Sequence, residues 1–199
     1  MKKILGTTCL VPFLSLSTFS DDFSEKKLET SFNAYFGQKY LDEDDWAPTD
    51  ELLTVGVGMD IGFSNSPFRF HVSYLSSESD TEVIPAGYDT LTVKTETSEL
   101  RIGGKYIVDS EGSISPYLGA GAVLVSAETM ATGADFEGDS VGGWVSAGLN
   151  WNINQTFHLG FEGSYSFAEV DINETTTDIE VASAEAGGLQ LALVLGLTF

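Results

Sequence analysis

The residues best suited to chemistry in this sequence are a histidine and a serine two positions apart, His71 and Ser73. A histidine can activate a nearby hydroxyl as a nucleophile when a carboxylate orients its ring, and Asp60 or Glu78 could supply that carboxylate. Large apolar residues alternate with this pair, so His71 and Ser73 share the polar face of one strand. We therefore expect His71 to be a hydrogen-bonded interior residue, and we expect no enzymatic activity.

A larger set of ionisable residues lies at strand positions that should point into the interior. The set is Lys39, Asp60, Arg69, His71, Glu99, Arg101, Lys105, His158 and Glu162. An unpaired ion in a dry interior is very costly, so we expect these residues to form a packed plug of ion pairs. Counted from the short turns, Asp60, His71 and Lys105 should lie at one depth. Arg101 and Glu162 should lie deeper and pair with each other.

The strand that organises the chain is the last one, residues 188–199. Every odd position from Leu189 to Phe199 is large and apolar, whereas the even positions are smaller or polar. A two-residue period indicates a strand with one apolar face, and a tilted strand of this length just crosses the hydrocarbon of a bilayer. A buried edge strand of a soluble sandwich is the alternative for this stretch alone.

Eight segments of the chain show this alternation, and none shows a helical period. The expected strands are 28–41, 52–63, 68–76, a long strand ending near Val108, 114–126, 141–153, 156–170 and 188–199. Their connections alternate between long and short, with long loops at 42–51, from 77 onward, at 127–140 and at 171–186. An even strand number with short turns at one end is typical of transmembrane barrels. The sequence therefore predicts an all-β, eight-stranded antiparallel up-and-down transmembrane β-barrel.

The first twenty residues have the features of a secretory signal peptide. Lys2 and Lys3 precede a mostly apolar run, and small residues lead to an expected cleavage before Asp21, although a cut after Ser17 is also compatible. The barrel domain should then be 21–199. The chain's one cysteine, Cys9, lies in the leader, so the mature domain should have no thiol chemistry.

The chain is strongly acidic, and the acid is unevenly distributed. Its formal charge is −21, and removal of Lys2 and Lys3 with the leader changes this to −23. Nucleic acid is therefore excluded as a partner. The long loops hold most of the acid and the short turns hold only Asp109 and Glu111. We expect the long loops to be extracellular, where divalent cations could bridge them to lipopolysaccharide phosphates. Because no Asp-x-Asp-x-Asp-Gly loop occurs, no dedicated metal site or cofactor is expected.

Three segments, 116–122, 143–149 and the terminal strand, resemble the small eight-stranded outer-membrane barrels, which are OmpA-like and OmpX-like. The resemblance implies a Gram-negative outer-membrane protein with a structural or surface-interaction role in the cell envelope, in contact with outer-membrane lipids. Phe199 resembles the terminal signal that the outer-membrane assembly machinery recognises. A narrow pore or an OmpW-like channel for small solutes is the alternative. A lipid A deacylase family also has an eight-stranded barrel with a His-x-Ser pair, but its longer motif does not match around His71.

Overall fold

The computed structural model describes residues 27–42, 46–47, 49–83, 91–108, 112–131, 134–174 and 179–199. The expected signal peptide at 1–20 lies outside these residues. Apart from a helical turn at Trp46, every element assigned within them is a β-strand. Among them, no helix is long and apolar enough to cross a membrane.

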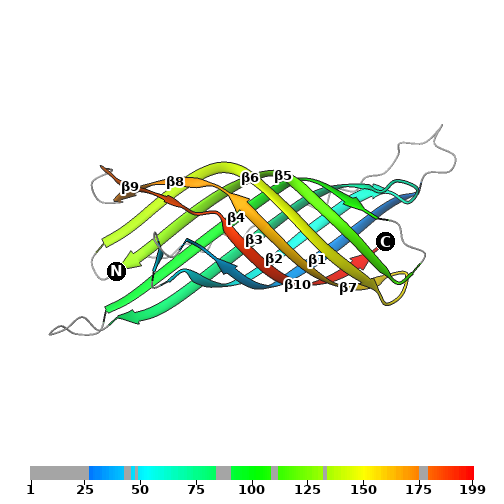
Figure 1. Ribbon diagram of the computed structural model, residues 1–199, viewed down its shortest axis with the longest axis horizontal. Helices are drawn as coiled ribbons and strands as arrows, with labels where there is room; N and C mark the ends of the chain where they lie inside the picture. Colours follow the sequence, from blue (N-terminus) through cyan, green and yellow to red (C-terminus); the bar gives the residue numbers. More distant parts are fainter. Residues whose placement is uncertain are drawn as a thin grey trace, which may run out of the picture.

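The ten strands have the following bounds: β1 (Leu28–Tyr40), β2 (Glu51–Phe63), β3 (Phe68–Val83), β4 (Leu91–Ile107), β5 (Ile114–Ala131), β6 (Ala134–Asn152), β7 (Phe157–Phe167), β8 (Glu169–Glu174), β9 (Ile179–Glu185) and β10 (Gly188–Thr198). Eight of them close into a barrel in the order β5-β4-β3-β2-β1-β10-β7-β6, with β5 pairing back onto β6 (Figure 1). All the pairings are antiparallel, which confirms the predicted up-and-down barrel.

The two faces of the barrel wall follow the predicted alternation. On β10, the side chains of Leu189, Leu191, Leu193 and Leu195 are exposed on the outer face, and those between them are buried. The same alternation runs through the other barrel strands, so large apolar side chains form a belt around the outside. A continuous apolar belt over a closed barrel is what a bilayer requires.

The two ends of the barrel differ. Figure 1 shows the short turns and the C-terminus at one end, with the hairpins of β3–β4, β5–β6 and β8–β9 extending from the other. The prediction of a loop at 127–140 is wrong, because β5 and β6 stay paired as far as Ala131 and Ala134. Above the apolar belt both faces of a strand can be polar, so the two-residue hydrophobic period that indicates a strand disappears there.

The loop predicted at 171–186 is also wrong. It contains the antiparallel hairpin of β8 and β9, and the preceding strand, predicted to run to 170, ends at Phe167. The chain turns at Ala168, whose carbonyl accepts hydrogen bonds from the N–H groups of Ala186 and Gly187 at 3.0 and 3.1 Å. Gly188 has a φ of 141°, a conformation that side chains disfavour, so glycine is suited to this joint.

Candidate functional site

A filled lumen

The interior of the barrel, its lumen, contains a relay of three polar side chains from β2 and β3. Asp60 and His71 are paired in the ladder, and their Oδ1 and Nδ1 atoms lie 2.6 Å apart. The other ring nitrogen of His71 lies 3.0 Å from the hydroxyl of Ser73. Asn33 donates a 2.7 Å hydrogen bond to Asp60. Of the two carboxylates considered for His71, Asp60 is therefore its partner, whereas Glu78 lies exposed on the outer face.

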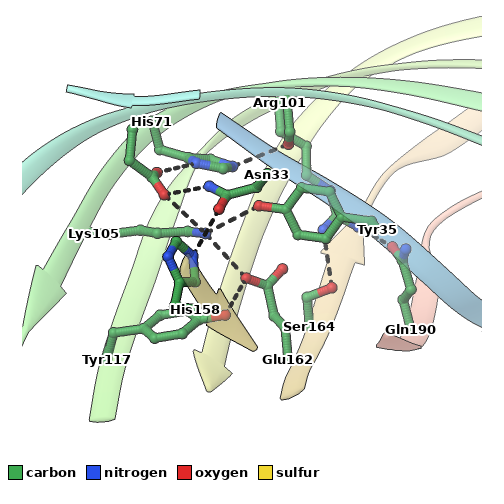
Figure 2. A network of polar contacts seen from close by, with 12 residues as sticks. Asn33, Tyr35, His71, Arg101, Lys105, Tyr117, His158, Glu162, Ser164 and Gln190 are labelled. Carbon is green, nitrogen blue, oxygen red and sulfur yellow. Dashed lines mark hydrogen bonds and ion pairs between the residues drawn. The ribbon is translucent and has the colours of Figure 1, made fainter. Parts of the chain in front are cut away.

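Lys105 joins this relay to the opposite wall of the lumen. Its Nζ lies 3.1 Å from Glu162, 3.9 Å from Asp60 and 3.3 Å from the hydroxyl of Tyr35. Tyr117 donates a 2.7 Å hydrogen bond to Glu162, and the ammonium lies 4.8 Å from the centre of the Tyr117 ring. Figure 2 shows these side chains converging on the Lys105 ammonium. Asp60, His71 and Lys105 thus lie together, as predicted.

A second cluster is centred on Glu99, nearer the end with the extended hairpins. Lys39 lies 2.8 Å from one carboxylate oxygen of Glu99, and Arg101 lies 2.6 Å from the other. Arg101 also donates to Ser164 and Gln190 at 2.9 and 2.8 Å. Glu99 and Arg101 are only 2% and 1% exposed. The cluster is therefore a dry ion triad whose donors are bound by acceptors from three strands, β4, β7 and β10, and by the carbonyl of Ala186.

The predicted pair of Arg101 with Glu162 is wrong. Following the ladder across the wall, Glu162 lies opposite Gly148, which lies opposite Tyr117, which lies opposite Ile107. Arg101 precedes Ile107 by six positions on β4, so it lies well away from Glu162 along the wall. Strand tilt shifts the register at each strand, so depth counted from the turns fails for strands that are not neighbours.

The charges of the two clusters balance. They contain three buried carboxylates and three buried cations, listed as Asp60, Glu99, Glu162, Lys39, Arg101 and Lys105. Each carboxylate contacts at least one of the cations. Such a network tolerates a low-dielectric interior because no ion is left uncompensated.

An apolar cluster, the apolar cap, extends from the level of the Glu99 cluster, where Val123 and Val125 lie opposite Arg101 and Glu99, toward the end with the extended hairpins. Its buried members are Leu41, Trp46, Leu52, Val123, Val125, Ala127, Trp144, Ala168, Val170, Ala184 and Ala186. Trp46 comes from the first long loop and donates a 2.7 Å hydrogen bond to the carbonyl of Glu185. The Trp144 ring contacts the His71 ring, with 5.3 Å between their centres, so the cap rests directly on the polar network.

The lumen is open at the end with the short turns. A cavity of about 540 Å³ there is lined mainly by amides and hydroxyls, together with Arg69 and His158. Arg69 lies 2.8 Å from Glu29, and His158 lies 3.0 Å from the amide oxygen of Asn33. All nine predicted interior residues therefore face the lumen, but Arg69 and His158 lie in this opening rather than in the ion clusters.

Tyrosines were expected on the inward faces of the strands, but no part in the ion clusters was predicted for Tyr35, Tyr117 or Trp144. These three aromatic side chains are buried in the lumen and contact the ion clusters. The alternation of side chains along each strand places these residues on the inward face, and this was the available signal in the sequence. Gly148 makes room for Tyr117, because a Cβ at residue 148 would clash with the ring and the hydroxyl oxygen of that tyrosine. Among the described residues, no group of three or more ligating side chains could hold a metal ion.

The comparisons with known proteins agree with this architecture. The sequence model of one family, described as "Outer membrane protein beta-barrel domain", matches residues 7–197. No curated protein matches the chain in sequence. Ail of Yersinia pestis, the attachment invasion locus protein, solved with the heparin analogue sucrose octasulfate, is a structural neighbour with a TM-score of 0.60 and 16% identity. That match covers 87% of this chain and 99% of Ail.

Two other solved barrels have similar scores. OprG of Pseudomonas aeruginosa has a TM-score of 0.59 at 13% identity, covering 87% of this chain and 97% of OprG. Neisserial surface protein A has a TM-score of 0.56 at 16% identity, covering 86% of this chain and 97% of that protein. At these identities the likeness shows the fold alone.

Proposed function

Because the chain belongs to the outer membrane protein beta-barrel family, we propose that it is a plugged, non-conducting barrel of the bacterial outer membrane whose acidic end faces outward and makes surface contacts. The observation that carries this proposal is the filled lumen. Two ion clusters and the apolar cap together fill the lumen above the open cavity at the turn end. An eight-stranded barrel is just wide enough for its own side chains to fill it, so these layers leave little room for solute.

The relay of Asp60, His71 and Ser73 resembles a catalytic triad in its distances, and it is the feature that most favours an enzyme. Its burial argues against that role. Ser73 is 2% exposed and faces the lumen, whereas a lipid acyl chain would lie on the opposite face of β3. The relay also hydrogen-bonds to Asn33 and lies beside Lys105, which fits a structural part of the plug. We therefore propose a non-enzymatic protein.

The acidic end favours a basic or cation-bridged partner. Four glutamates lie directly opposite one another on adjacent strands of the outer face, in the order Glu78, Glu96, Glu128 and Glu137. Like charges in such cross-strand positions repel one another. Lys94 forms ion pairs with Glu78 and Glu96 and so offsets part of this repulsion. The row is suited to a basic protein surface, or to divalent cations shared with lipopolysaccharide phosphates. A polyanion like the one bound to Ail would be repelled.

Single-channel conductance measurements test whether the lumen is plugged. Wild-type protein refolded into a planar bilayer should show no resolved single-channel steps, because both ion clusters and the cap lie across the lumen. A variant in which Trp46, Trp144, Glu99, Arg101, Lys105 and Glu162 are all replaced by alanine should show steps, since it removes both tryptophans of the cap and one ion pair from each cluster. Wild-type steps as large as those of this variant would mean that the lumen is a narrow pore.

Protease accessibility tests the orientation. A protease added to intact cells should cut at 42–51, because the first long loop should lie outside. A recognition sequence inserted after Gly112, in a short turn, should be cut only once the outer membrane is permeabilised. The reverse pattern would place the acidic end in the periplasm.

A further inference from the structure

The polar lining of the open cavity at the turn end comes largely from the inward residues nearest the short turn that joins β6 to β7. Asn150 and Asn152 belong to β6, and His158 lies on β7, opposite Asn152 in the ladder. The volume of about 540 Å³ is within the usual range for small-molecule sites. The cavity is therefore large enough for a ligand, and it lies at the opposite end of the barrel from the extended acidic hairpins.

Two glycines make room for the side chains that line this cavity. Gly160 lies opposite Asn150, and a Cβ at residue 160 would clash with the amide oxygen of Asn150. Gly196 lies opposite His158, and a Cβ at residue 196 would overlap the imidazole ring. Asn150 and His158 therefore occupy space that any side chain at residue 160 or 196 would take.

The amides of β6 have hydrogen-bonding capacity to spare. Among the described residues, the Asn150 carboxamide has no hydrogen-bond partner. Asn152 donates a 3.0 Å hydrogen bond to the hydroxyl of Ser115, which leaves the amide oxygen of Asn152 and the hydroxyl proton of Ser115 available. The lining of the cavity thus offers a ligand both donors and acceptors.

His158 adds one more acceptor. Asn33 donates its amide N–H to Asp60, so it presents its amide oxygen to Nε2 of His158, 3.0 Å away (Figure 2). An oxygen acceptor requires a proton on Nε2, and in the neutral ring this leaves Nδ1 as a hydrogen-bond acceptor. The polar network of the lumen therefore selects the tautomer of a side chain that lines the cavity.

The described lining of the cavity has no net fixed charge. Its residues of fixed charge are Glu29 and Arg69, and these two form an ion pair at 2.8 Å. Arg69 also donates a 2.8 Å hydrogen bond to the carbonyl of Phe63. In a chain of formal charge −21, this balanced polar surface favours a neutral ligand over a charged one.

From this geometry we propose that the open cavity binds a neutral N-acetylated saccharide. Sugar hydroxyls both donate and accept hydrogen bonds, as the lining does. A carboxamide presents a donor and an acceptor side by side, so that of Asn150 is complementary to the acetamido group of such a sugar. Ile107 and Phe157 provide apolar lining for the acetyl methyl group. The site does not depend on the plug or on the proposed surface contacts.

Other classes of ligand fit this cavity less well. A phosphate or carboxylate would have to take Arg69 from Glu29, and an ammonium group would have to take Glu29 from Arg69. An apolar molecule would remove the amides from water without replacing their hydrogen bonds, which is costly. A neutral ligand with many hydroxyl and amide groups avoids both costs.

Amide NMR of the full refolded chain in zwitterionic nanodiscs tests the site, with diacetylchitobiose, the disaccharide of N-acetylglucosamine, as the probe. Saturable shifts are expected at 113–115 and 150–158, with none in the hairpins at the acidic end. Cellobiose, which has hydroxyls in place of the acetamido groups, should bind about tenfold more weakly, the effect of losing one or two hydrogen bonds.

Two variants and a matched control locate the binding. Asn150→Ala should raise the half-saturating concentration of diacetylchitobiose about tenfold, because it removes a donor and an acceptor. Ser113→Trp should also weaken binding, because Ser113 is an exposed lining residue and the indole would fill the opening. Asn65→Ala removes the same amide from the β2–β3 turn, outside this cavity, and should change the value by less than about twofold. All three variants should keep the native spectrum.

Three results would overturn the proposal. The absence of saturable shifts with diacetylchitobiose would show that the cavity does not bind this class of sugar. Equal binding of cellobiose would remove the role of the acetamido group. Equal weakening by Asn65→Ala and Asn150→Ala would show that binding is not specific to this cavity. Both sides of a nanodisc are open to the ligand, so these results are independent of orientation and of conductance.

Discussion

Replacing Glu99 by glutamine is expected to lower the stability of the barrel in lipid by about 3–5 kcal/mol, as found when one partner of a buried ion pair is removed. Glu99 holds both Lys39 and Arg101, at 2.8 and 2.6 Å, and also accepts a hydrogen bond from Ser166. The neutral amide would leave two buried cations facing each other. Urea unfolding of protein folded into lipid vesicles measures the change as a shift of the midpoint.

Two further variants make this test specific. Lys39→Met in the Glu99→Gln background removes one of the stranded cations and should restore part of the loss. Ser146→Ala is the matched control, because Ser146 is buried in the same lumen but its hydroxyl has no hydrogen-bond partner among the described residues. Its midpoint should hardly change. If Glu99→Gln were equally harmless, the ions would be hydrated, and the lumen would not be a dry plug.

Replacing Leu193 by arginine should cost roughly 2–4 kcal/mol of folding into lipid, the range for an arginine at the midplane of a barrel's lipid face. Leu193 is 55% exposed on the outer face of β10. Its ladder partners, Phe36 and Phe161, are also outward and exposed. The site therefore lies within the apolar belt, where an arginine side chain cannot easily reach water.

Two positions on the same strand serve as controls. Leu189 lies beside Tyr40 and Tyr165, aromatic residues of the kind found at membrane interfaces, so its arginine should cost only about 0–1 kcal/mol. Thr198 lines the open cavity at the turn end, so Thr198→Arg should also be mild. If the arginine variants of residues 189, 193 and 198 lost the same amount of stability, the outer face of β10 would not be in contact with the bilayer.

Much of the wall could be predicted from residue types alone. The two-residue period of β10, with Leu193 outward and Ala192 inward, required no knowledge of neighbouring strands. Side-chain direction alternates strictly along a strand, so local sequence determines which residues face the lumen. All nine of the predicted ionisable residues face inward for this reason. The period failed at 127–140 and 171–186, because above the belt the outer face of a strand no longer meets lipid and need not be apolar.

Only the tertiary structure decided which lumen residues meet. The direction of a side chain is set by its position in the strand. Which side chains contact one another depends on strand tilt and on the shift of register that accumulates around the closed wall. Neighbouring strands therefore placed Asp60 and His71 together as predicted, whereas Arg101 binds Glu99 on its own strand and Glu162 binds Lys105. The apolar cap also depends on where separate strands end, because its members come from the first long loop and from several strands. The sequence determined the faces of this barrel, and closure of the sheet decided the contacts within it.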